Sequence, residues 1–207
     1  MTTTLGAFEW STTRGNPASG QVTLASDPVA GYSNTLRVSE TDAAGNDRGT
    51  ALSTVVAGDV ILVAADFAFV VGTPVDSGAF RSFPVTLTND FDDDNDEPDN
   101  EDEVQLLRRA AGTWPNTTEL AQVLNLGSDG ETDWDTTLDR VLASAINRVK
   151  SDTGNWSDNA DSPSNNQAQA ALRMAFLMWT SPDSPAFGLD PSYRGLMTGQ
   201  RRRFGIA

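Results

Sequence analysis

Asp90-Phe-Asp-Asp-Asp-Asn-Asp-Glu-Pro-Asp-Asn-Glu-Asp-Glu103 is the stretch of sequence that divides this chain. It holds ten acidic residues, no basic residue and one large apolar side chain, Phe91. Because such a segment repels itself and has almost nothing to bury, it is expected to be a linker or an extended loop. Residues 1–89 and residues 104–207 are therefore expected to form separate domains.

The first flank, residues 1–89, has the period of β-strands. Its apolar residues alternate with polar ones in short runs separated by glycines, at a spacing of about ten residues. The alternating residues are Val22 and Leu24, Leu36 and Val38, Val60 and Leu62, Phe67 and Phe69, and Phe83, Val85 and Leu87. This pattern predicts a small antiparallel β-sandwich or barrel, with a hairpin connection at Asp76-Ser77-Gly78.

The second flank changes to the helical period, with apolar residues at steps of three and four. The helical candidates are residues 104–111, 118–126, 134–149, 167–179 and 191–197. The segment 167–179 is apolar over most of its circumference, and only Gln169 and Arg173 give it a polar stripe. A helix of this kind is expected to be covered on nearly every side.

The predicted fold class is α+β. It consists of a small antiparallel β-sandwich or barrel domain at 1–89, an acidic linker or loop at 90–103, and an all-α helical-bundle domain at 104–207. The longest apolar stretch, 60–71, is interrupted by Asp66 and is shorter than the roughly twenty residues that a membrane-spanning helix needs. The amino end lacks the basic start and apolar core of a signal peptide, so a soluble protein made in a cytoplasm is expected.

The composition excludes most catalytic chemistry. The chain has 207 residues, 14 Lys and Arg against 29 Asp and Glu, a formal net charge of -15, no Cys and no His. Disulfides, Cys or His metal sites, cysteine nucleophiles and histidine bases are therefore impossible. The only lysine, Lys150, lies in a helical pattern, and the carboxylates of Asp133, Asp135 and Asp139 suit the positive end of a helix. We expect no enzyme, no catalytic residue and no cofactor.

The acidic run can be aligned with a calcium-binding loop. Positions one, three, five and twelve would be Asp92, Asp94, Asp96 and Glu103. Glu97 occupies the sixth position, where the sharp turn requires glycine, and no amphipathic helix leads into the run. A solvated acidic loop is the preferred interpretation, and no metal site is expected.

The tryptophans are a second candidate set, because aromatic rings can stack on sugars. They are Trp10, Trp114, Trp134, Trp156 and Trp179. They are scattered along the chain, and two of them fall on apolar faces of predicted helices. Packing is therefore the favoured role for most of them.

The end of the chain combines charge with apolar anchors. Arg201, Arg202 and Arg203 are followed by Phe204 and Ile206. Nucleic acid is a poor partner, because the acidic chain as a whole repels phosphates. Docking into an acidic groove of a partner protein fits these residues better, since it combines charge pairing with burial. The alternative is a disordered solubilising tail.

A series of features in residues 104–207 points to one family. In chain order they are Glu119–Leu126, Leu138–Gly154, Ala170–Trp179, the Asp183-Ser-Pro185 loop and the ending Arg201-Arg-Arg-Phe-Gly205. This series resembles the head-to-tail connector (adaptor) proteins of long-tailed double-stranded-DNA bacteriophages. The sequence departs from the pattern at Ser157–Asn166, where relatives often carry a longer loop. Residues 1–89 look like a small β module found as an extension on virion proteins of such phages.

The resemblance implies a structural protein of the virion neck, assembled in the host cytoplasm. The subunit would belong to a dodecameric ring that joins the portal protein to the tail or to a stopper or tail-completion protein. The ring would line the DNA ejection channel without binding the passing genome specifically, and no membrane is involved. Portal docking is expected from Arg201, Arg202, Arg203, Phe204 and Ile206. Packing of subunits in the ring is expected from Ala171, Leu172, Ala175, Phe176 and Trp179.

Two other functions stay open. The first is a virion accessory protein that binds a host surface or glycan through the β domain. The second is an enzyme that uses a pair of carboxylates.

Overall fold

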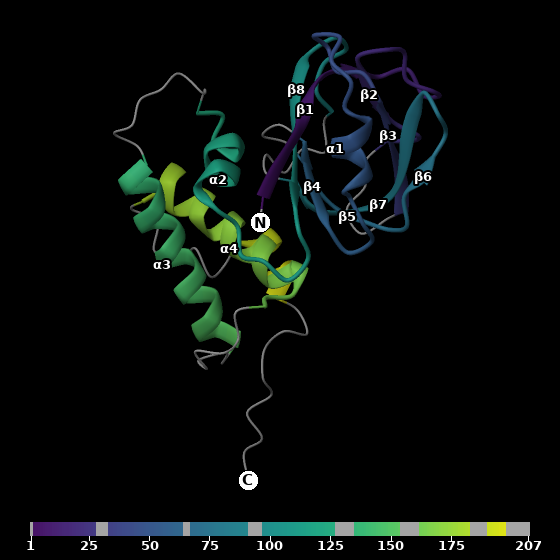
Figure 1. Cartoon of the computed structure of the whole chain (residues 1–207). Helices are drawn as coiled ribbons and strands as arrows, with labels where there is room; N and C mark the ends of the chain where they lie inside the picture. Colours follow the sequence, from purple (N-terminus) through teal and green to yellow (C-terminus); the bar gives the residue numbers. More distant parts are fainter. Residues whose placement is uncertain are drawn as a thin grey trace. The chain divides into compact units, whose positions relative to one another are not determined.

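The computed structural model describes residues 2–27, 33–63, 67–90, 97–126, 135–153, 162–182 and 190–197. The chain forms two compact units, Met1–Ala111 and Gly112–Ala207. Strands β1 to β8 and helix α1 belong to the first unit, and helices α2 to α5 belong to the second (Figure 1).

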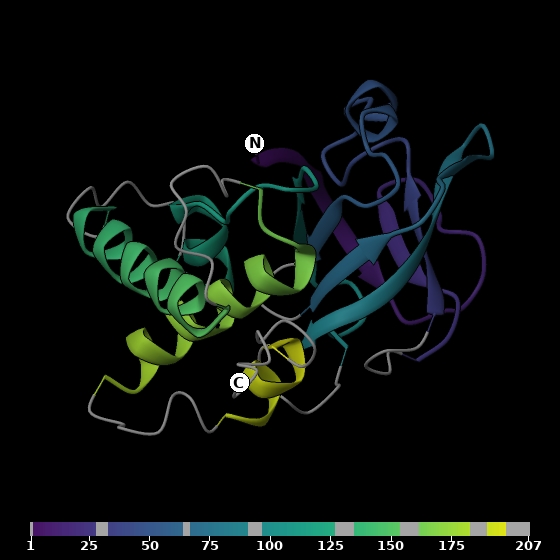
Figure 2. The same ribbon diagram turned by 90° about the horizontal axis from the view of Figure 1, so that it is seen from below.

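The first unit is built on one eight-stranded sheet. Its strands are β1 (Thr2–Ser11), β2 (Gln21–Leu24), β3 (Ser33–Ser39), β4 (Val60–Val63), β5 (Phe67–Val71), β6 (Val75–Asp76), β7 (Phe80–Asp90) and β8 (Glu103–Arg109). Their order is β3-β2-β1-β8-β4-β5-β7-β6, and β3 also pairs with β7. This extra pairing closes the sheet on itself and leaves β6 as a hairpin extension of β7. Figure 2 shows the strands of this unit from below.

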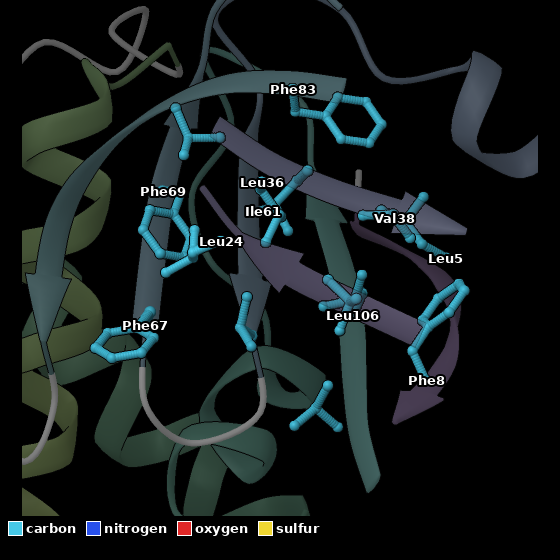
Figure 3. Packing of buried hydrophobic residues seen from close by; sticks show 14 of the residues in the cluster. Leu5, Phe8, Leu24, Leu36, Val38, Ile61, Phe67, Phe69, Phe83 and Leu106 are labelled. Atoms are coloured by element: carbon cyan, nitrogen blue, oxygen red, sulfur yellow. The ribbon is translucent and has the colours of Figure 1, made fainter. Parts of the chain in front are cut away.

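The interior of the closed sheet is filled by large apolar side chains. The residues that point into it include Phe8, Leu36, Ile61, Phe67, Phe69, Phe83 and Leu106, all fully buried (Figure 3). The predicted alternation is confirmed for β2, β3, β5 and β7, because the alternating residues predicted in these strands all belong to this core. In β4 the core residues are Ile61 and Val63 rather than the predicted Val60 and Leu62. All four residues of β4 are buried, so this strand is covered on both faces.

The predicted hairpin at 76–78 is confirmed. Strand β6 pairs with β7, and the turn between them places Gly78 at a φ of 85°. The side chain of Asp76 accepts a hydrogen bond from the backbone N–H of Gly78 at 2.8 Å. A positive φ costs glycine nothing, which explains its place in this turn.

The segment 104–111 corrects the sequence analysis. A helix is predicted there, but Glu103–Arg109 forms β8 between β1 and β4. Its buried apolar residues, Val104, Leu106 and Leu107, fit a short strand as well as a short helix, and periodicity cannot separate the two over so few residues. The hydrogen bonds that this segment makes to β1 and β4 stabilise it as a strand and not as a helix.

The predicted fold class is wrong. Over the described residues the fold is mixed α/β, with one eight-stranded sheet and five helices, 34% helix and 32% strand, and it is not a small β domain followed by an all-α bundle. Two elements make the difference. Strand β8 comes from the segment assigned to the bundle, and α1 (Gly49–Ser53) adds a helix within the β-rich flank. Residues 97–111 accordingly belong to the first compact unit.

The described end of the acidic run is folded against β1 and is not a free linker. Glu97 Oε2 accepts hydrogen bonds from Trp10 Nε1 at 3.2 Å and from Arg14 at 2.8 Å. Arg14 also bonds Glu97 Oε1 and forms an ion pair with Asp27 at 2.6 Å. The hydrogen bond to Glu97 is the main cause of the raised pKa of Arg14. Glu97 therefore fastens the acidic run to the sheet.

Backbone hydrogen bonds continue this attachment. The N–H of Trp10 donates to the carbonyl of Asp102, and the N–H of Glu101 donates to the carbonyl of Trp10, both at 2.7 Å. The chain thus enters β8 already aligned with β1. Asp92, Asp94 and Asp96, the other residues of the calcium-loop alignment, lie outside the described residues.

We predict that Glu97→Gln lowers the free energy of unfolding by about 1 kcal/mol, because the ion pair with Arg14 is lost and an amide offers one acceptor oxygen where the carboxylate offers two. Urea unfolding followed by tryptophan fluorescence measures the change. Glu103→Gln is the matched control, because this exposed carboxylate has no described ion pair, and its effect should stay within about 0.5 kcal/mol. Equal stability of Glu97→Gln and wild type would contradict the role of Glu97 in fastening the acidic run to the sheet.

The loop before α1 is organised by one carboxylate. Asp42 is 3% exposed and accepts hydrogen bonds from the backbone N–H of Asn46 at 2.8 Å and from Arg48 Nε at 2.7 Å. The pKa of Asp42 is lowered from 3.8 to about 2, first by the hydrogen bonds from Asn46 and then by Arg48. The charged form of Asp42 therefore stabilises the folded loop.

Because the folded pKa of Asp42 lies below its unfolded value, the stabilisation is present above pH 4 and is lost as the pH falls toward 2. Asp42→Asn should be less stable than wild type at pH 7, and the difference should shrink between pH 4 and pH 2. Urea unfolding at a series of pH values measures it, with the exposed Glu9→Gln as control. A difference that does not change with pH would refute the role of the charge.

In the second unit the described helices are α2 (Thr117–Val123), α3 (Asp135–Thr153), α4 (Asn165–Thr180) and α5 (Pro191–Met197). They confirm the helices predicted at 118–126, 134–149, 167–179 and 191–197, with shifted ends. Helix α4 packs against α2, α3 and α5. No helix among the described residues is both long and apolar enough to cross a membrane.

Candidate functional site

Helix α4 is the centre of the second unit. Nine consecutive residues from Gln167 to Ala175 are all buried, which confirms the expected cover on nearly every side for this part of the predicted segment 167–179. The helix begins with a capping box, in which the Ser164 side chain accepts from the N–H of Gln167 and the Gln167 side chain accepts from the N–H of Ser164. From Phe176 to Trp179 the helix is only half-buried.

The residues expected to pack between subunits fall into two groups. Ala171, Leu172 and Ala175 are fully buried within the single chain. Phe176 and Trp179 are half-buried and keep some surface in contact with solvent. Of these five described residues, therefore, only Phe176 and Trp179 in the last turns of α4 keep apolar surface that a neighbouring molecule could contact. The packing of subunits through these residues stays a prediction.

The polar stripe of α4 is buried as well. Arg173 is 2% exposed, and its guanidinium bonds both carboxylate oxygens of Asp190, at 3.2 and 3.4 Å. It also lies 5.6 Å from the centre of the Phe176 ring. Gln169 is fully buried, and among the described residues neither its amide nitrogen nor its amide oxygen has a hydrogen-bond partner. The sequence singled out both residues but could not show that they are buried.

Helix α5 is fixed by polar contacts at its start. Asp190 accepts from the backbone N–H of Tyr193 at 2.7 Å, which caps the helix. The fully buried Tyr193 donates its hydroxyl proton to Asp152 of α3 at 2.8 Å, and Asp152 also accepts from Arg148 at 3.2 Å. With the Arg173 ion pair, these bonds connect α5 to both α3 and α4. The chain beyond Met197 therefore starts from an anchored helix.

The residues predicted to dock to the portal are not described. Arg201, Arg202, Arg203, Phe204 and Ile206 lie outside the described residues. Sequence reasoning missed the Asp190, Tyr193 and Asp152 contacts, because their spacing along the chain gives no signal of a shared site.

The described tryptophans do not form a sugar-binding surface. Trp10 is fully buried in the core of the first unit. The ammonium group of Lys150, the only lysine in the sequence, lies 5.5 Å from the centre of the Trp114 ring. This cation–π contact gives both residues a structural role. Trp179 is half-buried on α4, whereas Trp134 and Trp156 lie outside the described residues.

The described carboxylates do not converge on a metal-binding arrangement. Among the residues that the structure describes, no group of three or more Asp and Glu side chains could hold a metal ion. Asp135 opens α3, Asp139 is exposed one turn later, and Asp133 is outside the described part of the chain. Comparison of the chain with protein-family models, with curated proteins and with solved structures finds no match. Its function must be inferred from its own residues and contacts.

Two glutamines of α4 should respond oppositely to substitution. Gln169→Met removes a buried amide without partners and should raise the free energy of unfolding by about 1–2 kcal/mol. Gln167→Met breaks the capping box and should lower it by about 1 kcal/mol. Urea unfolding of the two variants and of wild type measures both effects. A loss of stability in Gln169→Met would mean that its amide is satisfied in solution.

Proposed function

We propose that this protein is a structural subunit of a ring in the neck of a tailed bacteriophage, where it joins the portal vertex to the tail or a stopper. The proposal is supported mainly by the order of α2, α3 and α4, which overlap the segments that carry the sequence resemblance to phage adaptors. The anchored α5 lies directly before the basic and apolar ending of the chain.

The position of α5 suits a docking arm. Ten residues follow Met197, and a chain of that length reaches at most roughly 35 Å when extended. The arm would carry Arg201, Arg202 and Arg203 to an acidic groove, with Phe204 and Ile206 as apolar anchors. Because α5 is held by Asp152 and Arg173, the force on a docked arm would pass into the core of the second unit.

The negative charge of the chain suits the wall of a channel through which DNA leaves the capsid. Each copy carries a formal charge of -15, and a ring multiplies it. Such a wall repels phosphates, so the genome passes without sticking.

The alternative, glycan or host-surface binding by the first unit, has less support. Its described aromatic residues Phe8, Trp10, Phe67, Phe69 and Phe83 are all buried in the core. Only Phe80 is half-buried. Sugar recognition usually requires aromatic faces that are open to the ligand.

Removal of Arg201–Ala207 should leave folding unchanged, because α5 ends at Met197, and should abolish attachment to the portal. Circular dichroism checks folding, and co-sedimentation with portal rings measures attachment. Replacing the three arginines by lysine is the charge-matched control, and it should retain part of the binding. Assembly of normal tailed particles by the truncated protein would refute the docking arm.

The ring itself is tested separately by mass photometry of purified protein, alone and with portal, and by a reconstruction of the virion neck. Rings at the head–tail joint are the expected result. A monomer that ignores portal, or a position away from the neck, would overturn the proposed function.

A further inference from the structure

Helix α5 is too short to be stable by itself. It has seven residues, Pro191–Met197, whereas an isolated helix of fewer than roughly twelve residues is marginal in water. Gly195 weakens it further, because glycine has more conformational freedom to lose than any other residue. The helical form of α5 therefore depends on its contacts with α3 and α4.

One side of α5 is buried and the other is exposed. Tyr193, Leu196 and Met197 are buried, whereas Arg194 and Gly195 are exposed. Detachment of α5 would bring three large, mainly apolar side chains into water, and this opposes detachment. The helix can therefore be treated as an element with two states, docked on α3 and α4 or released from them.

Asp190 holds the start of α5 in two ways. Its carboxylate caps the helix by accepting the backbone N–H of Tyr193 at 2.7 Å, and it pairs with the buried guanidinium of Arg173 in α4 at 3.2 Å. The same side chain thus begins the helix and fixes its first turn to α4. Release of α5 would take this carboxylate away from a buried cation, which is strongly unfavourable.

Tyr193 makes a second attachment, to a different helix. Its backbone N–H is bound by Asp190, and its hydroxyl donates to Asp152 of α3 at 2.8 Å. Asp152 also accepts a hydrogen bond from the exposed Arg148 at 3.2 Å. Two donors therefore share one carboxylate, and of these two only the Tyr193 hydroxyl comes from α5. This arrangement allows the contribution of α5 to be separated from that of α3.

We propose that α5 is a latch that sets how tightly the end of the chain binds its partner protein. In the docked form, the bonds of Asp190 and Tyr193 fix the point from which the chain continues beyond Met197. In the released form this point is not fixed, so binding must also overcome the entropy of fixing it. The partner therefore binds the docked form more tightly, and a bound partner in turn stabilises docking. The inference rests on the proposed docking arm and adds a control of its affinity.

Two conservative substitutions loosen the latch. Tyr193→Phe removes the hydroxyl bond to Asp152 and keeps the buried ring, and Asp190→Asn removes the ion pair with Arg173 while asparagine still caps a helix. Hydrogen exchange of the full chain over 191–197, read by mass spectrometry, should quicken about tenfold in each variant and stay unchanged in α3. In the double variant, attachment to portal rings should weaken at least about threefold by co-sedimentation.

Gly195→Ala acts in the opposite direction. A Cβ on Gly195 would have open space among the described residues, and alanine favours a helix over glycine. Added to the double variant, this substitution should slow exchange of α5 about fivefold and restore part of the attachment to portal. A loss of attachment caused by damage elsewhere in the core would not be reversed by this exposed residue.

Arg148→Gln is the matched control. It removes the other hydrogen bond to Asp152 and leaves the Tyr193 hydroxyl in place, so exchange of α5 and attachment to portal should equal those of wild type. Circular dichroism verifies folding of every variant. Wild type supplies a readout that needs no substitution, because saturating portal should slow exchange over 191–197.

The outcomes separate the latch from the proposed function. Absence of portal attachment by wild type would remove the docking arm, and the latch with it. Wild-type attachment combined with equal attachment of a double variant whose α5 exchanges faster would overturn the latch alone. The same conclusion would follow from exchange of α5 that neither the substitutions nor bound portal changes, or from equal losses of attachment in Arg148→Gln and Tyr193→Phe.

Discussion

The pairing of β8 between β1 and β4 is the constraint on which the first unit depends. Strand β8 is matched to seven residues of β1 and to four residues of β4. Without it the strands would form two groups, β3-β2-β1 and β4-β5-β7-β6, joined only through β3 and β7. The closed interior, which excludes water from the aromatic core, therefore requires a strand that follows the acidic run.

Polar contacts at both ends of β8 hold it in place. Before the strand, Glu97 is bound by Trp10 and Arg14. After it, Asp59, which is 1% exposed, accepts from the N–H of Ala111 at 3.1 Å and from Arg108 at 2.6 Å. A buried carboxylate with several donors is stable where an unpaired one would not be. Within the described end of the acidic run, Glu97 is neutralised by Arg14, whereas Asp99, Glu101, Asp102 and Glu103 stay exposed to solvent.

The second unit uses buried polar groups for a different purpose. Arg173, Asp190, Tyr193 and Asp152 tie three helices together at the point where the chain turns toward its end. Apolar packing around α4 provides most of the stability, while these directional bonds select one orientation of α5. A protein that acts through its shape, as proposed here, depends on such fixed orientations.

The sequence alone determined the absence of thiol and imidazole chemistry and the acidic net charge, because these follow from composition. It also determined the four helices of the second unit and most core strands, because a long periodic segment depends only on residues that are close together in the chain. It could not find β1, since the bulge between Thr4 and Gly6 places Leu5 and Phe8 in the same core at a spacing that hides alternation. Tertiary structure alone decided that 103–109 is a strand, that Ile61 rather than Leu62 faces the core, and that Gln169 is buried. Each of these features depends on which distant segment supplies the hydrogen bonds or covers the side chain. The spacing of apolar residues within a short segment carries no information about such distant partners.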